Sequence, residues 1–165
     1  MKTSASFKIA AAFCCVLALA ACSKKNTPDL EAANSGAGVA MPGSEPDFAV
    51  NVGDRIYFAE DQSTLSPEAE ETLRKQAAWL GQYPGVTIQI EGHADERGTR
   101  EYNISLSARR ATATREFLIA QGIDGARVSS IAYGKERPAA LCDAEQCWSQ
   151  NRRAVTVITG GARTS

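Results

Sequence analysis

The alternation of apolar and polar residues along the chain predicts an α/β domain. In residues 86–91 every second residue is apolar, which is typical of a β-strand with one buried face. Residues 66–80 begin with Ser-Pro-Glu, a helix start, and then carry apolar side chains at helical spacing. A second and longer helix is predicted over residues 100–121, where Gly122 ends it.

Three further short apolar runs predict the remaining strands, at residues 55–58, 128–133 and 154–158. The order β-α-β-α-β-β favours a two-layer α/β fold, with helices on one face of a mixed sheet. We place this domain at residues 54–162. Residues 22–53 show no sustained period and are rich in Ala, Gly, Asn, Ser and Pro, which predicts a flexible tether that reaches about 100 Å when extended.

The predicted helix over residues 100–121 has a core-facing stripe and one apolar residue outside it. Four residues form the predicted stripe: Ile104, Ala108, Ala111 and Leu118. Arg110 flanks this stripe and Leu106 lies further round the helix. Leu106 is therefore either a residue that lines a pocket or an ordinary exposed leucine.

The N-terminal segment, residues 1–21, is predicted to be a targeting signal. Two lysines precede an apolar run that is shorter than the about 20 residues of a membrane-spanning helix. The run ends in Leu-Ala-Ala before Cys22 and resembles a bacterial lipobox, in which the cysteine carries diacylglycerol and an N-acyl chain. An ordinary cleavable signal is the alternative. Ser23 replaces the Asp typical of inner-membrane lipoproteins, which favours an outer-membrane anchor with the domain in the periplasm of a Gram-negative bacterium.

Charge and cysteine placement narrow the possible functions. The chain has 165 residues and a formal net charge of −1, so no basic field exists to hold a nucleic acid. Of its five cysteines, two lie in the predicted signal and one is Cys22. Cys142 and Cys147 are the remaining pair, and in an oxidising compartment we expect a disulfide between them. Two free thiols are the alternative.

A charged, glycine-containing loop at residues 92–99 joins a predicted strand to the long helix. In open α/β folds, ligands tend to bind beyond the carboxyl ends of strands, where such loops meet helix N-termini. The loop offers the carboxylate of Asp95, and the helix offers the guanidinium of Arg110. This pair suits a small ion with charges of both signs. A purely structural salt bridge is the alternative.

An ordered set of motifs resembles the OmpA-like peptidoglycan-binding domain over about residues 54–160. The motifs are Gly92-His-Ala-Asp95-x-x-Gly98-Thr99, Tyr102-Asn103-x-x-Leu106-Ser107-x-x-Arg110-Ala111, Tyr133-Gly134 and Asn151-Arg152-Arg153. The resemblance implies that Asp95 and Arg110 clasp the ammonium and the carboxylate of meso-diaminopimelate on a peptidoglycan stem peptide. The further pocket residues that it implies are Phe58, Asp61, Arg97, Gly98, Asn103 and Leu106.

The lipobox, the tether and the Asp-Glu-Arg-Gly-Thr loop resemble the lipoprotein members of this family, which act with TolB and other Tol proteins. This implies a link between the outer membrane and the cell wall, with roles in envelope integrity and cell division. A module that mainly docks TolB and a peptidoglycan hydrolase are the alternatives. No nucleophile–base–acid set is evident and His93, where relatives often carry Asn, is the single histidine, so we expect no enzyme, metal or cofactor.

Overall fold

The structure is a computed structural model that describes residues 40–164. The predicted signal, Cys22 and most of the predicted tether lie outside these residues. In the described part of the chain, no helix combines the length and the apolar character needed to cross a membrane.

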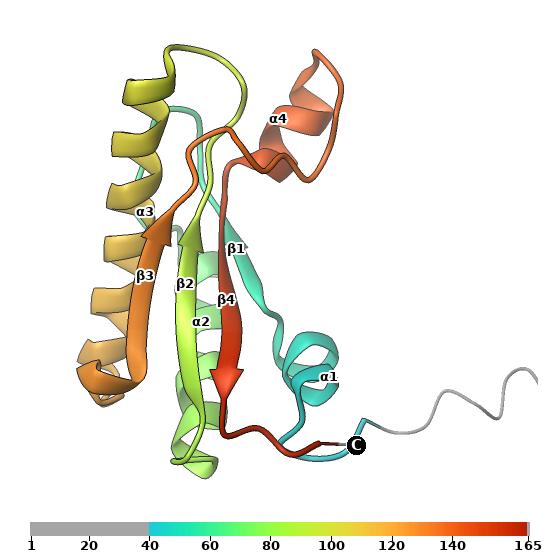
Figure 1. Cartoon of the computed structure of the whole chain (residues 1–165), viewed down its shortest axis with the longest axis vertical. Coiled ribbons are helices and arrows are strands. Elements are labelled where there is room, and N and C mark those ends of the chain that lie inside the picture. The colour runs from blue at the N-terminus through green and yellow to red at the C-terminus, as the bar shows by residue number, and fades with distance from the viewer. Residues whose placement is uncertain (1–39, 165) are drawn as a thin grey trace, which may run out of the picture. The chain divides into compact units, whose positions relative to one another are not determined.

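One mixed sheet carries the strands of residues 40–164, in the order β1-β4-β2-β3 (Figure 1). The strands are β1 Arg55–Tyr57, β2 Thr87–Gly92, β3 Val128–Ala132 and β4 Arg153–Gly160. β2 pairs in parallel with β3 and antiparallel with β4, and Gly92 lies opposite both Ala132 and Ala154. The carboxyl ends of β2 and β3 therefore lie at the same edge of the sheet.

Helices α2 (Pro67–Gln82) and α3 (Arg100–Ala120) cover one face of this sheet, which confirms the predicted class (Figure 1). α2 begins as predicted, because Ser66 accepts a hydrogen bond from the backbone N–H of Ala69 and proline occupies the first helical position. Thr99 caps α3 in the same way and accepts from the N–H of Tyr102.

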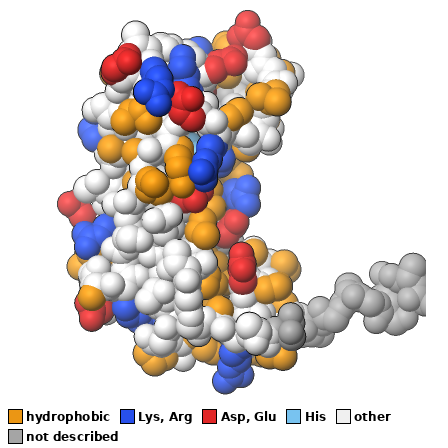
Figure 2. Space-filling model, viewed as in Figure 1, with side chains coloured by type: hydrophobic (Ala, Val, Ile, Leu, Met, Phe, Trp, Pro, Cys, Tyr) orange, Lys and Arg blue, Asp and Glu red, His pale blue; other side chains and the backbone are white. Residues whose placement is uncertain are grey.

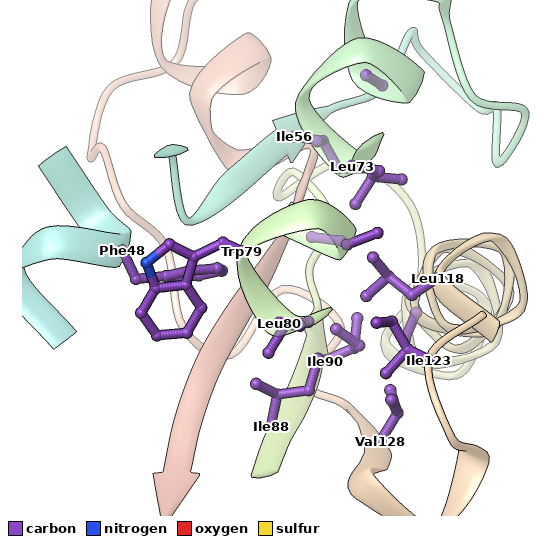
Figure 3. Packing of buried hydrophobic residues seen from close by; sticks show 14 of the residues in the cluster. Phe48, Ile56, Leu73, Trp79, Leu80, Ile88, Ile90, Leu118, Ile123 and Val128 are labelled. Carbon is purple, nitrogen blue, oxygen red and sulfur yellow. The ribbon is translucent and has the colours of Figure 1, made fainter. Parts of the chain in front are cut away.

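The hydrophobic core lies between these helices and the sheet (Figure 3). Ile88 and Ile90 project from β2 toward Leu80 of α2 and Leu118 of α3. All four side chains are at most 1% exposed. Burial of each such side chain is worth about 1.5–3 kcal/mol, so this packing holds α2 and α3 against β2.

The buried face of α3 is more polar than the predicted stripe. Ala111 and Leu118 are buried as predicted, but Ile104 is half-buried and Ala108 is exposed. The buried set is Asn103, Leu106, Ser107, Arg110, Ala111, Thr114 and Leu118. Its polar members form hydrogen bonds inside the protein. The prediction from hydrophobic periodicity alone therefore misplaced the buried stripe.

A glycine at the end of β2 allows this polar helix face to approach the sheet. A Cβ atom on Gly92 would overlap the backbone carbonyl of Ser107 in α3. The Ser107 hydroxyl in turn accepts a 2.9 Å hydrogen bond from the N–H of Gly134, just after β3. The carboxyl ends of β2 and β3 are thus fixed against the first turns of α3.

Residues 41–53, predicted to be tether, pack on the domain instead. They form α1 (Glu45–Asp47) and a π-helical turn, η1 (Phe48–Val52). Phe48 is 1% exposed and its ring centroid lies 4.9 Å from that of Trp79. Asp47 accepts a 2.8 Å bond from the Trp79 indole N–H, which holds the pKa of Asp47 below its usual value. The predicted domain boundary at residue 54 is therefore wrong. Phe48 and Asp47 anchor this segment to Trp79, although its sequence has no hydrophobic periodicity.

The segment between β3 and β4 contains a helix that was predicted to be loop. This helix, α4 (Glu145–Asn151), has no side-chain cap at its start, so the sequence lacks the usual N-terminal signal. A disulfide joins Cys142 to Cys147, with their Cα atoms 5.6 Å apart. A short 3₁₀ turn, η2 (Gly125–Arg127), precedes β3.

Candidate functional site

A cavity of about 270 Å³ lies beside the start of α3 and the loops that follow β1 and β2. Its lining residues are Glu60, Asp61, Asp95, Arg97, Gly98, Tyr102, Asn103, Leu106 and Arg110. Figure 2 shows acidic and basic side chains close together at the end of the domain where α3 begins. The structure therefore brings together every predicted pocket residue except Phe58.

Asp95 is a largely buried, fully hydrogen-bonded carboxylate. It accepts bonds from Arg97 Nη2 at 2.7 Å, Arg97 Nε at 3.3 Å and the Arg97 backbone N–H at 3.1 Å. Arg152 Nη1 adds a longer bond of 3.4 Å. Burial alone would raise the pKa of Asp95, but the bonds from the two arginines outweigh it and hold the pKa below its usual value. Asp95 is therefore ionised at neutral pH.

Arg110 lies at the bottom of the cavity and is completely buried. Its guanidinium donates to three backbone carbonyls, those of Gln62 at 2.8 Å, His93 at 2.9 Å and Ala59 at 3.1 Å. A guanidinium carries five N–H donors, so two are not used in these three bonds. Burial lowers the pKa of Arg110 to about 10, which leaves it charged at neutral pH.

In the described part of the chain, Asp95 and Arg110 form no ion pair with each other. Arg97 and Arg152 are the basic partners of Asp95, whereas Arg110 bonds to carbonyl groups. The alternative of a structural salt bridge between the predicted pair therefore does not fit the geometry. Phe58 does not line the cavity, but its ring centroid lies 5.1 Å from the Arg110 guanidinium, which makes it a cation–π partner of that side chain.

Arg97 forms the side of the cavity and is 33% exposed. Besides its bonds to Asp95, it donates from Nη1 to Glu60 at 2.8 Å. These bonds, above all those to Asp95, raise the pKa of Arg97 above its usual value. The carbonyl of Arg97 accepts a 2.7 Å bond from Asn103, which fixes the loop against the first turn of α3.

The remaining predicted residues form the rim and the apolar wall. Leu106 is only 5% exposed and lines the cavity, so it is not an ordinary exposed leucine. Gly98 has φ 81°, a conformation that favours glycine, and lines the cavity where the loop turns into α3. Asp61 also has a positive φ of 54° and accepts a hydrogen bond from the Tyr102 hydroxyl. An Asp in this conformation at a pocket rim is typical of a functional position.

Four groups around the cavity were missed as site residues, and one of them, the lining residue Tyr102, is itself part of a motif. Glu60 precedes Asp61 and pairs with Arg97. Arg152, from the Asn-Arg-Arg motif, bridges Asp95 and Glu145. Nothing in the sequence indicated that Trp148 contacts the site, because this contact depends on helix α4, which was not predicted.

His93 does not line the cavity, although its carbonyl helps to hold Arg110. Its ring is 1% exposed, and neither ring nitrogen has a hydrogen-bond partner. Burial, followed by the nearby charges of Arg153 and Arg137, lowers the pKa of His93 to about 4. Across residues 40–164, no three or more His, Cys, Asp or Glu residues are grouped so that they could hold a metal ion.

The structure is a two-layer α/β domain with a cavity lined by paired charges. A family model described as the OmpA family matches residues 57–153. The C-terminal domain of MotB from Helicobacter pylori superimposes with a TM-score of 0.61 at 21% identity, over 65% of this chain and 84% of that one, and shows the fold alone.

More similar proteins narrow this class. The peptidoglycan-associated lipoprotein of Rhizobium meliloti is 56% identical over 97% of this chain and 92% of its own length. That of Brucella melitensis is 55% identical over 99% of this chain and 98% of its own. The crystal structure of the peptidoglycan-associated lipoprotein from Burkholderia pseudomallei matches with a TM-score of 0.63 at 38% identity, over 64% of this chain and 90% of that one. The chain therefore belongs to the OmpA family and, within it, to the peptidoglycan-associated lipoproteins.

The buried His93 makes the stability of the domain depend on pH. In the unfolded chain a histidine binds a proton below about pH 6.5, whereas folded His93 does so only near pH 4. The folded pKa is depressed, so the stabilisation is fully present above about pH 6.5 and is lost as the pH falls toward 4. The limiting slope for one proton is about 1.4 kcal/mol per pH unit.

We therefore expect His93→Asn to flatten the fall in the free energy of unfolding between pH 6.5 and 4.5. Urea denaturation of both proteins at several pH values measures this slope. Carboxylates away from residue 93 titrate alike in both proteins, so the difference between the two slopes reports His93 together with Glu91, whose carboxylate lies 3.5 Å from His93 Nε2. Equal slopes would show that His93 is protonated in the folded protein as easily as in the unfolded one.

Proposed function

We propose that the domain binds the stem peptide of peptidoglycan through the amino-acid centre at the end of the meso-diaminopimelate side chain. The observation that carries this proposal is the cavity in which the ionised Asp95 and the buried guanidinium of Arg110 both lie. Diaminopimelate presents an ammonium and a carboxylate on one carbon, which matches a site with charges of both signs. The curated relatives are named for their association with peptidoglycan, the polymer that carries such stem peptides.

The two N–H donors that Arg110 has left would bind the ligand's carboxylate. They are pre-positioned, because the other three hold the guanidinium on the carbonyls of Ala59, Gln62 and His93. Charge-assisted hydrogen bonds from a guanidinium to a carboxylate are stronger than neutral ones, and more so away from water. The apolar side chain of Leu106 offers a surface for the ligand's methylene groups.

The ligand's ammonium would bind Asp95 by exchange. Arg97 and Arg152 already supply four bonds to this carboxylate, and the 3.4 Å bond from Arg152 is the longest. That bond is the one that costs least to replace. Asp61 at the rim adds a second carboxylate, which draws a cation toward this side of the cavity.

We infer binding without catalysis. The carboxyl group best placed to act as a base, Asp95, has a lowered pKa and is therefore a weak proton acceptor at neutral pH. The lining holds no serine, cysteine, threonine or histidine that would act as a nucleophile beside it. This favours a binding protein over the alternative of a peptidoglycan hydrolase.

Substitutions in the cavity test the proposed binding. Asp95→Asn keeps the shape and removes the charge, so the ligand's ammonium loses its partner. Loss of one side of a buried charge pair costs about 2–5 kcal/mol, so we expect at least tenfold weaker binding of a diaminopimelate-containing stem peptide. Isothermal titration of the full-length protein in detergent measures this affinity.

Arg110→Lys is the matching change on the other side of the ligand. Alanine is unsuitable here, because it would leave three carbonyls without their donor and weaken the fold. Lysine keeps the charge but loses the fork, and we expect weaker binding. Arg109→Lys is the control, since exposed Arg109 bonds to Ser105, lies near the Tyr102 hydroxyl and does not line the cavity, so this variant should bind as the wild type does. Wild-type affinity in Asp95→Asn would contradict the proposed site.

We further propose that Cys22 carries diacylglycerol and an N-acyl chain that hold the protein on the periplasmic face of the outer membrane. Several acyl chains, at about 0.8 kcal/mol per buried CH₂, give a nearly permanent anchor. Because residues 41–53 belong to the described domain, the covalent link from Cys22 to the domain is residues 23–40, which reach at most roughly 65 Å when extended. The domain must therefore meet its ligand closer to the membrane than the predicted boundary at residue 54 implies.

Cys22→Ser tests this anchor. We expect a folded protein that is neither lipidated nor processed, because the thiol that accepts the lipid is gone. Cys15→Ser, inside the apolar run, is the matched control and should leave lipidation unchanged. Intact-mass measurement of both proteins decides the matter, and acyl chains on the Cys22→Ser protein would contradict the assignment.

The family resemblance also supports TolB as a partner that uses the same face as peptidoglycan. We propose that the two compete, which would let the Tol proteins regulate the link between outer membrane and cell wall during division. Purified TolB added to the stem-peptide titration should then lower the apparent affinity of the wild type. An unchanged affinity would place TolB on another surface.

A further inference from the structure

The loop that carries Asp95 is held from outside the cavity by the segment between β3 and β4. Lys135 Nζ donates to the carbonyls of Glu96 at 3.0 Å and Gly98 at 2.8 Å. Trp148 Nε1 donates to the Glu96 carboxylate at 2.9 Å. The Trp148 ring also lies 4.2 Å from the Arg97 guanidinium. The loop is thus fixed both at its backbone and at its most exposed basic side chain.

Trp148 is presented by an element that is closed at both ends. The disulfide between Cys142 and Cys147 ties the chain before α4 to the first turn of the helix. At the other end, the Asn151 side chain accepts from the N–H groups of Ala139 and Ala140, at 2.7 and 3.1 Å. It also donates to the Ala140 carbonyl at 2.9 Å. These bonds limit the freedom of α4 to turn its tryptophan away from the loop.

We propose that Trp148 is a positioning residue for the ligand site. Its ring holds the Arg97 guanidinium in place, and Arg97 in turn holds the Asp95 carboxylate in the orientation that receives the ligand's ammonium. Trp148 itself does not line the cavity, so its effect on the ligand passes through the loop that it contacts at Arg97 and at Glu96, and we assign the larger part to Arg97. This inference rests on the proposed binding of the stem peptide.

The physical reason is that Arg97 is long and partly exposed. Exposed ion pairs of flexible side chains contribute little, because the attraction is screened and ordering the side chain costs entropy. A guanidinium that stacks on an indole gains a cation–π attraction in the geometry that its planar group prefers. Arg97 is then held on one side by Trp148 and on the others by Asp95 and Glu60. A site ordered before the ligand arrives binds more tightly than one ordered by it.

Two substitutions separate the ring from the rest of the side chain. Trp148→Leu keeps an apolar group but removes the aromatic face and the indole N–H. We expect the full-length protein to bind the diaminopimelate-containing peptide about three- to tenfold more weakly, as for loss of one cation–π contact. Trp148→Phe keeps an aromatic face without the N–H, and should restore affinity to within about twofold of the wild type. Isothermal titration gives both values, and thermal unfolding shows whether each variant is folded.

A double-mutant cycle with Arg97→Ala distinguishes positioning from a general loosening of α4. If Trp148 acts through Arg97, then Trp148→Leu has no further effect in the Arg97→Ala protein. If α4 merely supports the fold, the two losses add. The wild type offers an independent readout, because the chain has two tryptophans and hence two indole N–H signals in an NMR spectrum. The Trp148 signal should shift when the peptide binds, and this shift should be lost in Arg97→Ala.

The outcomes separate this inference from the function on which it rests. Wild-type affinity in Asp95→Asn overturns the proposed function itself. If Asp95→Asn weakens binding but Trp148→Leu binds as well as the wild type or better, only the role of Trp148 is wrong. Additive losses in the cycle, or a Trp148→Phe protein as weak as Trp148→Leu, likewise overturn the role of the ring.

Discussion

The buried guanidinium of Arg110 is the interaction on which the candidate site depends. It joins the carbonyls of Ala59 and Gln62, in the loop after β1, to that of His93 after β2, and it does so from α3. A buried charge is costly unless it is hydrogen-bonded, so these bonds are required for the arginine to be there at all. One side chain thus fixes three segments around a cavity and keeps two donors for a ligand.

The charged groups around Arg110 form a network in which most carboxylates and guanidiniums are already paired with each other. Asp95 is paired with Arg97 and Arg152, and Arg97 is stacked on Trp148. The cavity is therefore ordered before any ligand binds, which lowers the entropic cost of binding. The same bonds lower the pKa of Asp95, which makes it a weaker proton acceptor. Binding of a doubly charged group follows from this arrangement more naturally than chemistry does.

The sequence predicted those features that have local signals. The cap at Ser66 and the alternation over residues 86–91 are determined by neighbours in the chain, and the motif around Asp95 predicted residues that line the cavity. The hydrogen-bond partners of Arg110 could not be predicted from the sequence. They are backbone carbonyls 48 and 51 residues away, and every residue has such a carbonyl. The buried stripe of α3 was misplaced since its polar residues are satisfied by tertiary contacts. Phe48 and α4 were missed because each depends on a few long-range or covalent links.

The central claim is that one cavity recognises an ammonium and a carboxylate on the same carbon. The most direct measurement compares the affinity of the wild-type protein for two stem peptides, one with meso-diaminopimelate and the other with lysine. Lysine offers the ammonium but not the carboxylate, so the donors of Arg110 would face the cavity without a partner. We predict that the diaminopimelate peptide binds at least tenfold more tightly, as expected for loss of a charge-assisted bond. Equal affinity for the two peptides would contradict this account of the site.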